Sequence, residues 1–172
     1  MSNLYYDEID SPIGALLVVF HGDDIVRIDY GTMEIMEQRL KKWTERYFTE
    51  PVFIKSPDKA APVKRDFDDY FNGESKAFSF PFTFHGTPFQ KQVWQVLYDG
   101  IPYGKTTTYK DIAIKIQNPK AVRAVGGAVN KNPLSIVVPC HRVIGSSGKM
   151  VGYNGGLDKK EYLLTFEKNN AS

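Results

Sequence analysis

The segment TYKDIAIKIQNPKAVRAVGGAVN, residues 108–130, decides how the C-terminal half of this chain folds. Thr108 can cap a first helix that ends near Ile116, and after a tight turn Pro119 starts a second helix that ends near Asn130. Two short helices around a tight turn form a helix-turn-helix unit, which in DNA-binding proteins places its second helix in a groove. Because many helical hairpins bind nothing, this pattern needs support from the rest of the sequence.

The second helix of this unit is small and apolar, which is unusual for a helix that reads base edges in the major groove. Its long polar side chains are Lys120 and Arg123. Small residues let a backbone approach another surface closely but offer few hydrogen-bond donors to bases. The pattern fits a helix held against phosphates or a shallow groove with Arg123 as its probe, and equally a packed internal helix whose Arg123 forms an ion pair. The other residues that we expect at a DNA surface are Ala121, Val122, Ala124 and Gly126.

The net charge of +2 over 172 residues hides two unequal halves. Residues 1–85 hold 10 Lys/Arg and 15 Asp/Glu, a net charge of −5, whereas residues 86–172 hold 12 and 5, a net charge of +7. Such asymmetry suggests that the basic half meets a polyanion, or that charges cluster by chance on solvated faces. We place a domain boundary near His85-Gly86, with a scaffold domain before it and a DNA-binding domain after it.

Targeting signals and disulfides are not expected. No apolar run approaches the roughly 18 residues that a membrane span needs, and the N-terminus lacks a basic stretch followed by an apolar one. We therefore expect an intracellular, cytoplasmic protein. The one cysteine, Cys140, excludes an intrachain disulfide and a multi-cysteine zinc site.

The N-terminal half shows short strands followed by helices. Three β-rich runs separated by turn residues predict an antiparallel meander, at residues 5–9, 15–20 and 25–30. Apolar residues at helical spacing predict a helix over residues 36–47, and a second helix is expected from Pro62 to Asn72. Phenylalanines alternate from residue 78 to 84 as in a strand, but Pro81 restricts this segment to a sheet edge or a linker.

The segment SIVVPCHRVIG, residues 135–145, predicts an apolar strand that runs into a polar corner. There Cys140 is followed by His141 and Arg142, cationic neighbours of the kind that lower a thiol pKa and make the thiolate a nucleophile. The alternative is a buried structural cysteine, the common state of an isolated cysteine.

One carboxylate in the last predicted helix, residues 157–167, is out of place. Glu161 lies four residues after Leu157 and three before Leu164, and so shares their apolar face. A carboxylate there needs a partner, and His141 is a candidate. A Glu–His pair would orient the imidazole towards a thiol, as in a catalytic triad. Alternatively, Glu161 lies at the edge of the face and reaches solvent.

The segment IVVPCHRV, residues 136–143, resembles the active-site motif of the O6-alkylguanine-DNA alkyltransferases, also called methylated-DNA–protein-cysteine methyltransferases. The resemblance covers residues 87–167 in the order and spacing of that family. Residues 1–85 resemble its small α/β domain with a ribonuclease-H-like sheet in size and predicted elements only. The implied fold is α+β, with a mainly helical C-terminal domain that carries the helix-turn-helix. The flanking matches are Thr108-Tyr109, residues 123–128, Asn132-Pro133, residues 153–156 and Lys160-Glu161.

The resemblance implies DNA repair by direct reversal of damage. The thiolate of Cys140 would take the alkyl group from guanine O6, and also from thymine O4, in an irreversible single displacement. His141 and Glu161 would remove the thiol proton through a water, and Asn132 would support the turn between the helix-turn-helix and the active site. Arg123 would fill the place of the flipped-out nucleotide. Each molecule would act once, because a thioether has no easy route back to a thiol.

The resemblance also implies how the base is held. Tyr109 would press sterically against the neighbouring phosphate and donate a hydrogen bond to the purine, and Tyr153 would line the pocket that holds the base. The carbonyls of Cys140 and Val143 and the amide of Asn154 would read the base edge. We expect a monomer that binds duplex DNA through its minor groove and phosphates, which suits lesions that arise in any sequence.

Two departures from the family and two alternatives remain at this point. Some relatives carry an N-terminal zinc site, but residues 1–85 contain no Cys and only His21 and His85, so we expect neither metal nor cofactor. Asn154 stands where Ser is common, which affects tolerance for bulky alkyl groups. The alternatives are a helix-turn-helix regulator with a structural cysteine, which would need polar reading residues, and a cysteine hydrolase, whose base usually lies elsewhere in the chain.

Overall fold

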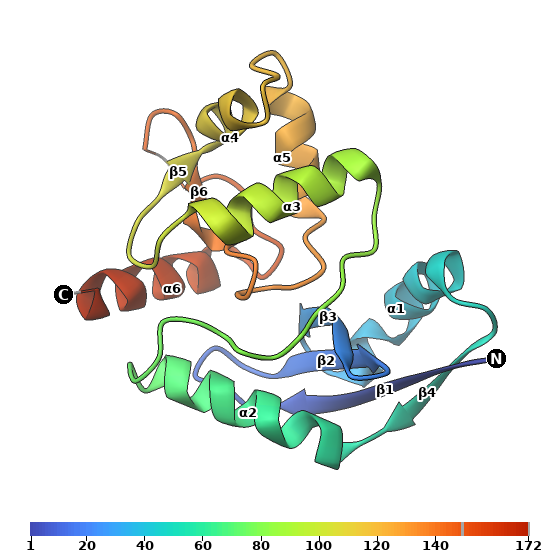
Figure 1. The fold of residues 1–172 in the computed structure, drawn as a ribbon. Coiled ribbons are helices and arrows are strands. Elements are labelled where there is room, and N and C mark those ends of the chain that lie inside the picture. Colours follow the sequence, from blue (N-terminus) through green and yellow to red (C-terminus); the bar gives the residue numbers. More distant parts are fainter. Residues whose placement is uncertain (149, 172) are drawn as a thin grey trace. The chain divides into compact units, whose positions relative to one another are not determined.

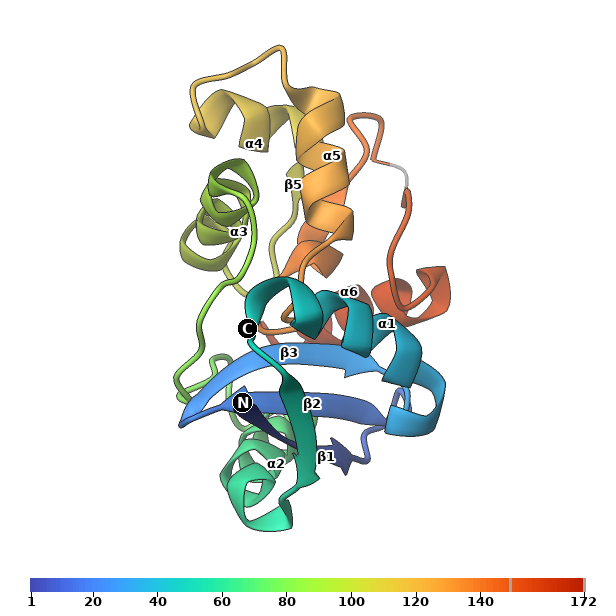
Figure 2. The same cartoon turned by 90° about the vertical axis from the view of Figure 1, so that its right-hand side faces the viewer.

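A computed structural model describes residues 1–148 and 150–171, and the chain divides into two compact units, Met1–His85 and Gly86–Ser172. Figures 1 and 2 show their elements in two views. Within the described residues, no helix is both long enough and apolar enough to cross a membrane. The two units are described separately.

The first unit is built on a four-stranded sheet with the strand order β3-β2-β1-β4. The predicted antiparallel meander is confirmed as β1 (Ser2–Ile9), β2 (Leu16–His21) and β3 (Asp24–Tyr30). The sequence analysis missed β4 (Pro51–Lys55), which pairs in parallel with β1. This strand is a short edge strand with mostly exposed side chains, so it lacks the apolar alternation that marks the others.

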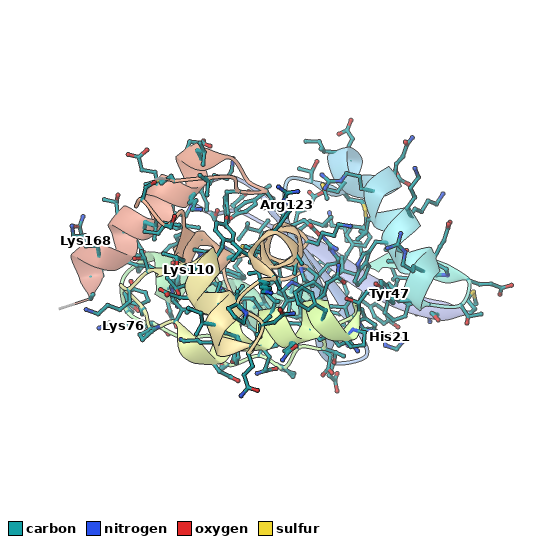
Figure 3. The ribbon with its side chains drawn as sticks, turned by 90° about the horizontal axis from the view of Figure 1, so that it is seen from above. His21, Tyr47, Lys76, Lys110, Arg123 and Lys168 are labelled. Atoms are coloured by element: carbon teal, nitrogen blue, oxygen red, sulfur yellow. The ribbon has the colours of Figure 1, made fainter. Side chains whose placement is uncertain are left out.

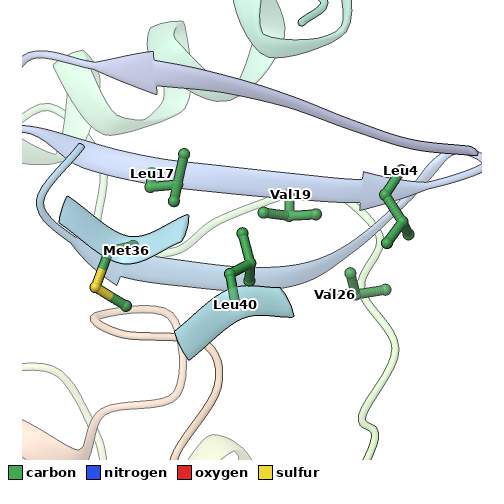
Figure 4. Packing of buried hydrophobic residues seen from close by; sticks show 6 residues of the cluster. All are labelled: Leu4, Leu17, Val19, Val26, Met36 and Leu40. Atoms are coloured by element: carbon green, nitrogen blue, oxygen red, sulfur yellow. The ribbon is translucent and has the colours of Figure 1, made fainter. Parts of the chain in front are cut away.

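Helices cover both faces of this sheet (Figure 2). The predicted helix α1 (Met33–Tyr47) packs on one face, and α2 (Pro57–Phe71) packs on the other. Five consecutive residues of β2 are buried, as expected for a strand between two helical layers. Figure 4 shows the core between the sheet and α1, formed by Leu4, Leu17, Val19, Val26, Met36 and Leu40.

Two elements of the first unit differ from the sequence prediction. Helix α2 begins at Pro57 rather than Pro62, because the Ser56 side chain caps it by accepting from the Lys59 amide. Pro57 therefore occupies the first helical position, and Pro62 lies at an exposed position farther along the helix. Residues 78–84 form no extended strand; a single bridge joins Phe82 to Ile25, in agreement with the linker interpretation.

The second unit is mainly helical, as predicted. Its first helix opens with the predicted capping box between Thr87 and Gln90. Two short strands pair in parallel: one directly precedes α4, and the other directly follows the 3-10 turn at Cys140–Arg142, called the cysteine turn below. The elements are α3 (Pro88–Gly100), β5 (Thr107–Thr108), α4 (Tyr109–Lys115), α5 (Val122–Asn130), the 3-10 turn η1 (Cys140–Arg142), β6 (Val143–Ile144) and α6 (Leu157–Asn170).

The helix-turn-helix is confirmed as α4 and α5, with Thr108 capping α4 through the Asp111 amide. Helix α5 begins three residues later than predicted, at Val122. Pro119 belongs to a turn in which the Ala121 amide donates to the Asn118 carbonyl at 3.0 Å. Proline suits the second position of such a turn as well as the start of a helix, so its presence alone did not decide between them.

Candidate functional site

The lone cysteine lies in a buried turn rather than at the end of a strand. The predicted strand before Cys140 is wrong: residues 135–138 form turns, and Ile136 has a positive φ of 72°. The side chains of this segment are nevertheless buried. Its hydrophobicity therefore reflects burial in a turn, which the sequence alone could not distinguish from burial in a strand. The Cys140 side chain is 5% exposed.

Asn132 holds this turn and contacts the sulfur. Its Nδ2 donates to the Val138 carbonyl at 2.8 Å and to Cys140 Sγ at 3.1 Å. Its Oδ1 accepts from the Leu134 amide at 2.9 Å. One buried amide therefore connects the end of the helix-turn-helix segment to the thiol, which is the position that the resemblance implies for this residue.

The environment of the thiol opposes ionisation. Burial raises the pKa of Cys140 to about 11, although the hydrogen bond from Asn132 and the positive charge of Lys160 act in the opposite direction. The sequence-based expectation of a lowered thiol pKa is therefore wrong for this conformation. The cationic neighbours expected from sequence do not act on the sulfur, because His141 Nε2 and the Arg142 guanidinium are bonded to a carboxylate and, for Arg142, also to a carbonyl.

That carboxylate belongs to Glu167 on α6, which is 1% exposed. Its Oε2 lies 2.9 Å from His141 Nε2, and Arg142 donates to both of its oxygens at 2.8 and 2.9 Å. Burial alone would raise the pKa of Glu167, but the hydrogen bonds from His141 and Arg142 outweigh it and hold the pKa well below its usual range. The carboxylate is therefore ionised at neutral pH.

The imidazole of His141 is neutral in this arrangement. Its side chain is fully buried, and this burial lowers its pKa although Glu167 acts to raise it. Nδ1 is buried and has no hydrogen-bond partner among the described residues. A neutral ring whose Nε2–H donates to Glu167 keeps Nδ1 as an acceptor, which is the form that can remove a proton.

The predicted pairing of His141 with Glu161 is wrong. Glu161 is exposed, as the alternative interpretation held, and the buried side of α6 carries Lys160, Leu163 and Glu167. The apolar stripe that led to Glu161 is rotated by about one residue, near 100°, from the buried face. Because two of the three buried positions are charged, hydrophobic periodicity could not identify that face.

Lys160 is a second residue whose role sequence reasoning missed, since it entered only as part of a motif match. Its side chain is fully buried, and Nζ donates to the carbonyls of Val143 at 2.6 Å, Val151 at 3.0 Å and Gly152 at 3.3 Å. These three bonds use all three ammonium protons. Burial lowers the pKa of Lys160, while the nearby thiol acts to raise it. Lys160 thus fixes the loop that follows the cysteine turn.

The loop of residues 150–154 lies near both helices of the helix-turn-helix. Tyr109 Oη, at the start of α4, donates to the Val151 carbonyl at 3.4 Å. Asn154 Nδ2 donates to the carbonyl of Asn130, the last residue of α5. Tyr153 is half-buried in the same loop. Burial raises the pKa of Tyr109, and a charge on Cys140 would raise it further, so its hydroxyl keeps its proton.

The candidate DNA-contact residues lie at the N-cap and in the first turns of α5, outside its buried positions. Val122, Arg123 and Ala124 are exposed, and Ala121 and Gly126 are half-buried. Arg123 projects from this helix in Figure 3, and no ion pair involves it within the part of the chain that the structure describes. The interpretation of Arg123 as part of a packed internal ion pair is therefore wrong. The described residues also contain no group of three or more His, Cys, Asp or Glu placed to hold a metal ion.

Both units of the chain match domains of one known protein family. Residues 4–84 match the ribonuclease-like domain of the 6-O-methylguanine DNA methyltransferase family, and residues 88–169 match its DNA-binding domain. A methylated-DNA–protein-cysteine methyltransferase of Haemophilus influenzae is 43% identical over 169 residues, covering 98% of this chain and 88% of the relative. One from Methanosarcina barkeri is 42% identical, covering 97% of this chain and 99% of the relative.

Solved structures agree with the sequence relatives. The crystal structure of Mycobacterium tuberculosis O6-methylguanine methyltransferase superposes with a TM-score of 0.84 at 38% identity, covering 98% of this chain and 95% of that one. A structure of M. tuberculosis OGT in complex with DNA superposes with a TM-score of 0.82 at 37% identity, covering 96% and 94%. The chain therefore belongs to the 6-O-methylguanine DNA methyltransferase family.

Proposed function

We propose that this chain repairs alkylated DNA by moving the alkyl group from guanine O6, and from thymine O4, to Sγ of Cys140. The observation that carries this assignment is the buried His141–Glu167 pair beside the sole cysteine. Relatives at about 40% identity over nearly the whole chain are named for this reaction. In this assignment the task of the histidine and the carboxylate is to deprotonate the thiol.

The raised thiol pKa makes this proton removal necessary. With a pKa of about 11, only about one thiol in ten thousand is ionised at pH 7. Neutral His141 takes the proton at Nδ1, through a water, and Glu167 stabilises the imidazolium that forms. Lys160 stabilises the thiolate, since its positive charge already favours ionisation of Cys140.

Transfer then proceeds as a single displacement. The sulfur–carbon bond forms while the carbon–oxygen bond to guanine O6 breaks, and the electron pair returns to the purine. The purine regains a proton, for which we assign the Tyr109 hydroxyl as donor. The thioether and the unmodified base are the products, and a thioether has no easy route back to a thiol. Each molecule therefore acts once.

The helix-turn-helix presents the base to this site. The small outer side of α5 lies against the minor groove and phosphates of duplex DNA, and exposed Arg123 takes the place of the extruded nucleotide. The carbonyls of Cys140 and Val143 and the amide of Asn154 read the base, with Tyr153 lining the pocket. We propose that the protein does this as a monomer. A relative with a solved DNA complex and the net charge of +7 on residues 86–172 support DNA as the partner.

Intact-mass measurement after incubation with a duplex that contains one O6-methylguanine tests the reaction. We expect the protein to gain one methyl group on Cys140, and Cys140→Ser to gain none. Catalytic turnover that leaves the protein unmodified would overturn the proposal. DNA binding without any transfer would instead favour the regulator with a structural cysteine.

Replacement of Arg123 tests the DNA-facing role of α5. We expect Arg123→Ala to slow methyl transfer from duplex DNA at least about tenfold, because extrusion of a base costs a few kcal/mol that the inserted side chain offsets. Transfer from free O6-benzylguanine needs no extrusion and should change less than about twofold by the same reasoning. Equal losses on the two substrates would show that Arg123 does not assist extrusion.

A further inference from the structure

The loop between α3 and β5 contacts the side chain of Arg142, although the transfer chemistry described above makes no use of this loop. Arg142 Nη1 donates to the main-chain carbonyl of Ile101 at 2.7 Å. The Cζ atom of Arg142 lies over the ring of Tyr103, 5.7 Å from the ring centroid. A guanidinium at this distance is attracted by the negative face of an aromatic ring. The loop therefore offers both a hydrogen-bond acceptor and a ring face to one buried cation.

The other two nitrogens of the same guanidinium hold Glu167. Nε donates to Oε1 at 2.8 Å, and Nη2 donates to Oε2 at 2.9 Å. Oε2 also lies 2.9 Å from His141 Nε2. Because a guanidinium is a rigid plane, this two-bond contact fixes the plane of the carboxylate as well. The direction in which Oε2 meets His141 therefore depends on where the Arg142 guanidinium lies.

The loop is placed by a few specific contacts rather than by continuous packing. Gly104 has a φ of 81°, and a Cβ built on it would lie 2.5 Å from Ala171 Cβ at the end of α6. Glycine therefore allows the loop to approach this helix closely. Beside this contact, a cavity of about 150 Å³ is lined by Gly104 and Thr106 on the loop and by residues of α6. The contact between Tyr103 and Arg142 is thus one of those that hold the loop and the ion pair together.

The charges around this cluster are well defined. Burial raises the pKa of Tyr103, and the negative charge of Glu167 raises it further, although Arg142 acts in the opposite direction. The ring is therefore neutral at pH 7 and attracts Arg142 without replacing its carboxylate partner. The charges that act on His141 are those of Glu167, Arg142 and Lys160. Two of these three belong to the ion pair that the Tyr103 ring contacts.

We propose that Tyr103 is a positioning residue for the removal of the thiol proton. Its ring holds the Arg142 guanidinium, and Arg142 in turn orients the Glu167 carboxylate that stabilises the imidazolium. This inference rests on the proposed function, in which His141 accepts the proton of Cys140. When the ring is removed, the guanidinium can tilt and the carboxylate follows it. The imidazolium is then less well stabilised, so the thiol loses part of its base.

The test measures single-turnover transfer from a duplex that contains O6-methylguanine, at pH 7 and at pH 9. Each rate constant is expressed per folded molecule, with the folded fraction taken from circular dichroism. Tyr103→Leu and Tyr103→Met remove the ring from a half-buried position, whereas Tyr103→Phe keeps it. Tyr98→Leu, at a tyrosine of α3 that is 41% exposed, is the matched control.

We expect Tyr103→Leu and Tyr103→Met to be about fivefold slower than the parent protein at pH 7, as for loss of one cation–π contact. At pH 9 the difference should narrow to less than about twofold. The reason is that the ionised fraction of a thiol with a pKa of about 11 grows about tenfold per pH unit, so transfer depends less on His141. Tyr103→Phe and Tyr98→Leu should stay within about twofold of the parent at both pH values.

The outcomes separate this inference from the proposed function. A deficit of equal size at both pH values, or no deficit at pH 7 in either variant without the ring, overturns the positioning role and leaves the function intact. A Tyr103→Phe variant as slow as Tyr103→Leu also overturns it, since the ring would then not be the group that acts. A parent protein that transfers no methyl group overturns the function, and the inference with it.

Discussion

Both units of this chain bury apolar side chains, but the second also buries a cluster of polar and charged ones. The first packs hydrocarbon between its sheet and α1, in the cluster around Leu40 shown in Figure 4. The second places five polar or charged residues, each less than a tenth exposed, around one thiol: Asn132, His141, Arg142, Lys160 and Glu167. Hydrocarbon burial stabilises a fold directly, whereas buried charges cost free energy unless they are paired. The comparison indicates that the interior of the first unit serves stability, whereas the interior of the second unit serves chemistry as well.

The largest effect is expected where that chemistry is concentrated, at Glu167. Glu167→Gln leaves the guanidinium of Arg142 buried without its countercharge and removes the stabilisation of the His141 imidazolium. We expect the free energy of unfolding to fall by about 3–5 kcal/mol. Methyl transfer by the folded fraction should slow at least about a hundredfold. Urea unfolding and single-turnover transfer rates measure the two effects.

Glu161→Gln is the matched control for this experiment. Glu161 is exposed on the same helix, so the same substitution should change stability by less than about 0.5 kcal/mol and leave transfer unaltered. If Glu161→Gln were the more damaging change, the pairing in the structure would be wrong and the expectation from sequence would be restored.

A smaller effect, on stability alone, is expected in the apolar unit. Leu40 is 2% exposed, and Leu40→Ala should lower the free energy of unfolding by about 3 kcal/mol through lost burial and the cavity left behind. The transfer rate per folded molecule should stay the same. Ile35→Ala, at a 73% exposed position of the same helix, should cost less than about 0.5 kcal/mol. A slowed transfer in folded Leu40→Ala would contradict the division of roles.

The smallest effect concerns the thiol itself and appears only at alkaline pH. Because burial raises the pKa of Cys140 from 9.0 to about 11, the unfolded chain ionises first. The stability that the neutral thiol contributes is complete below about pH 9 and is lost as the pH rises towards 11. The parent protein should therefore lose about 1 kcal/mol more than Cys140→Ser between pH 8 and pH 10, since the substitution removes this one titration. Identical losses in the two proteins would show that the thiol pKa is not raised.

Much of the fold was predictable because it rests on local signals. The meander is marked by turn residues, α3 by its capping box and the helix-turn-helix by Thr108 and its apolar periodicity, and the structure confirms all three. The errors occur where local signals are ambiguous. Strand β4 is short and mostly exposed, and the buried segment before Cys140 is apolar without being extended.

The site was predictable in part for a similar reason. Cys140 and His141 are adjacent in sequence, so their proximity needed no fold, and the motif around them is specific. Glu167 lies 26 residues beyond His141, and only the packing of α6 against the cysteine turn brings the two side chains together. The buried face of α6 carries Lys160 and Glu167, so the rule that buried faces are apolar selected Glu161 instead.

By itself, the sequence determined the order of most of the elements, the helix-turn-helix, the chemically distinctive cysteine and the family to which the chain belongs. These depend on neighbouring residues, and short-range rules govern them. Only the tertiary structure decided which carboxylate orients His141, that Lys160 and Asn154 hold the loop of residues 150–154, and that the thiol is less acidic than its neighbours in sequence suggest. Each of these depends on desolvation and on contacts between segments far apart in the chain, and those arise only when the elements pack.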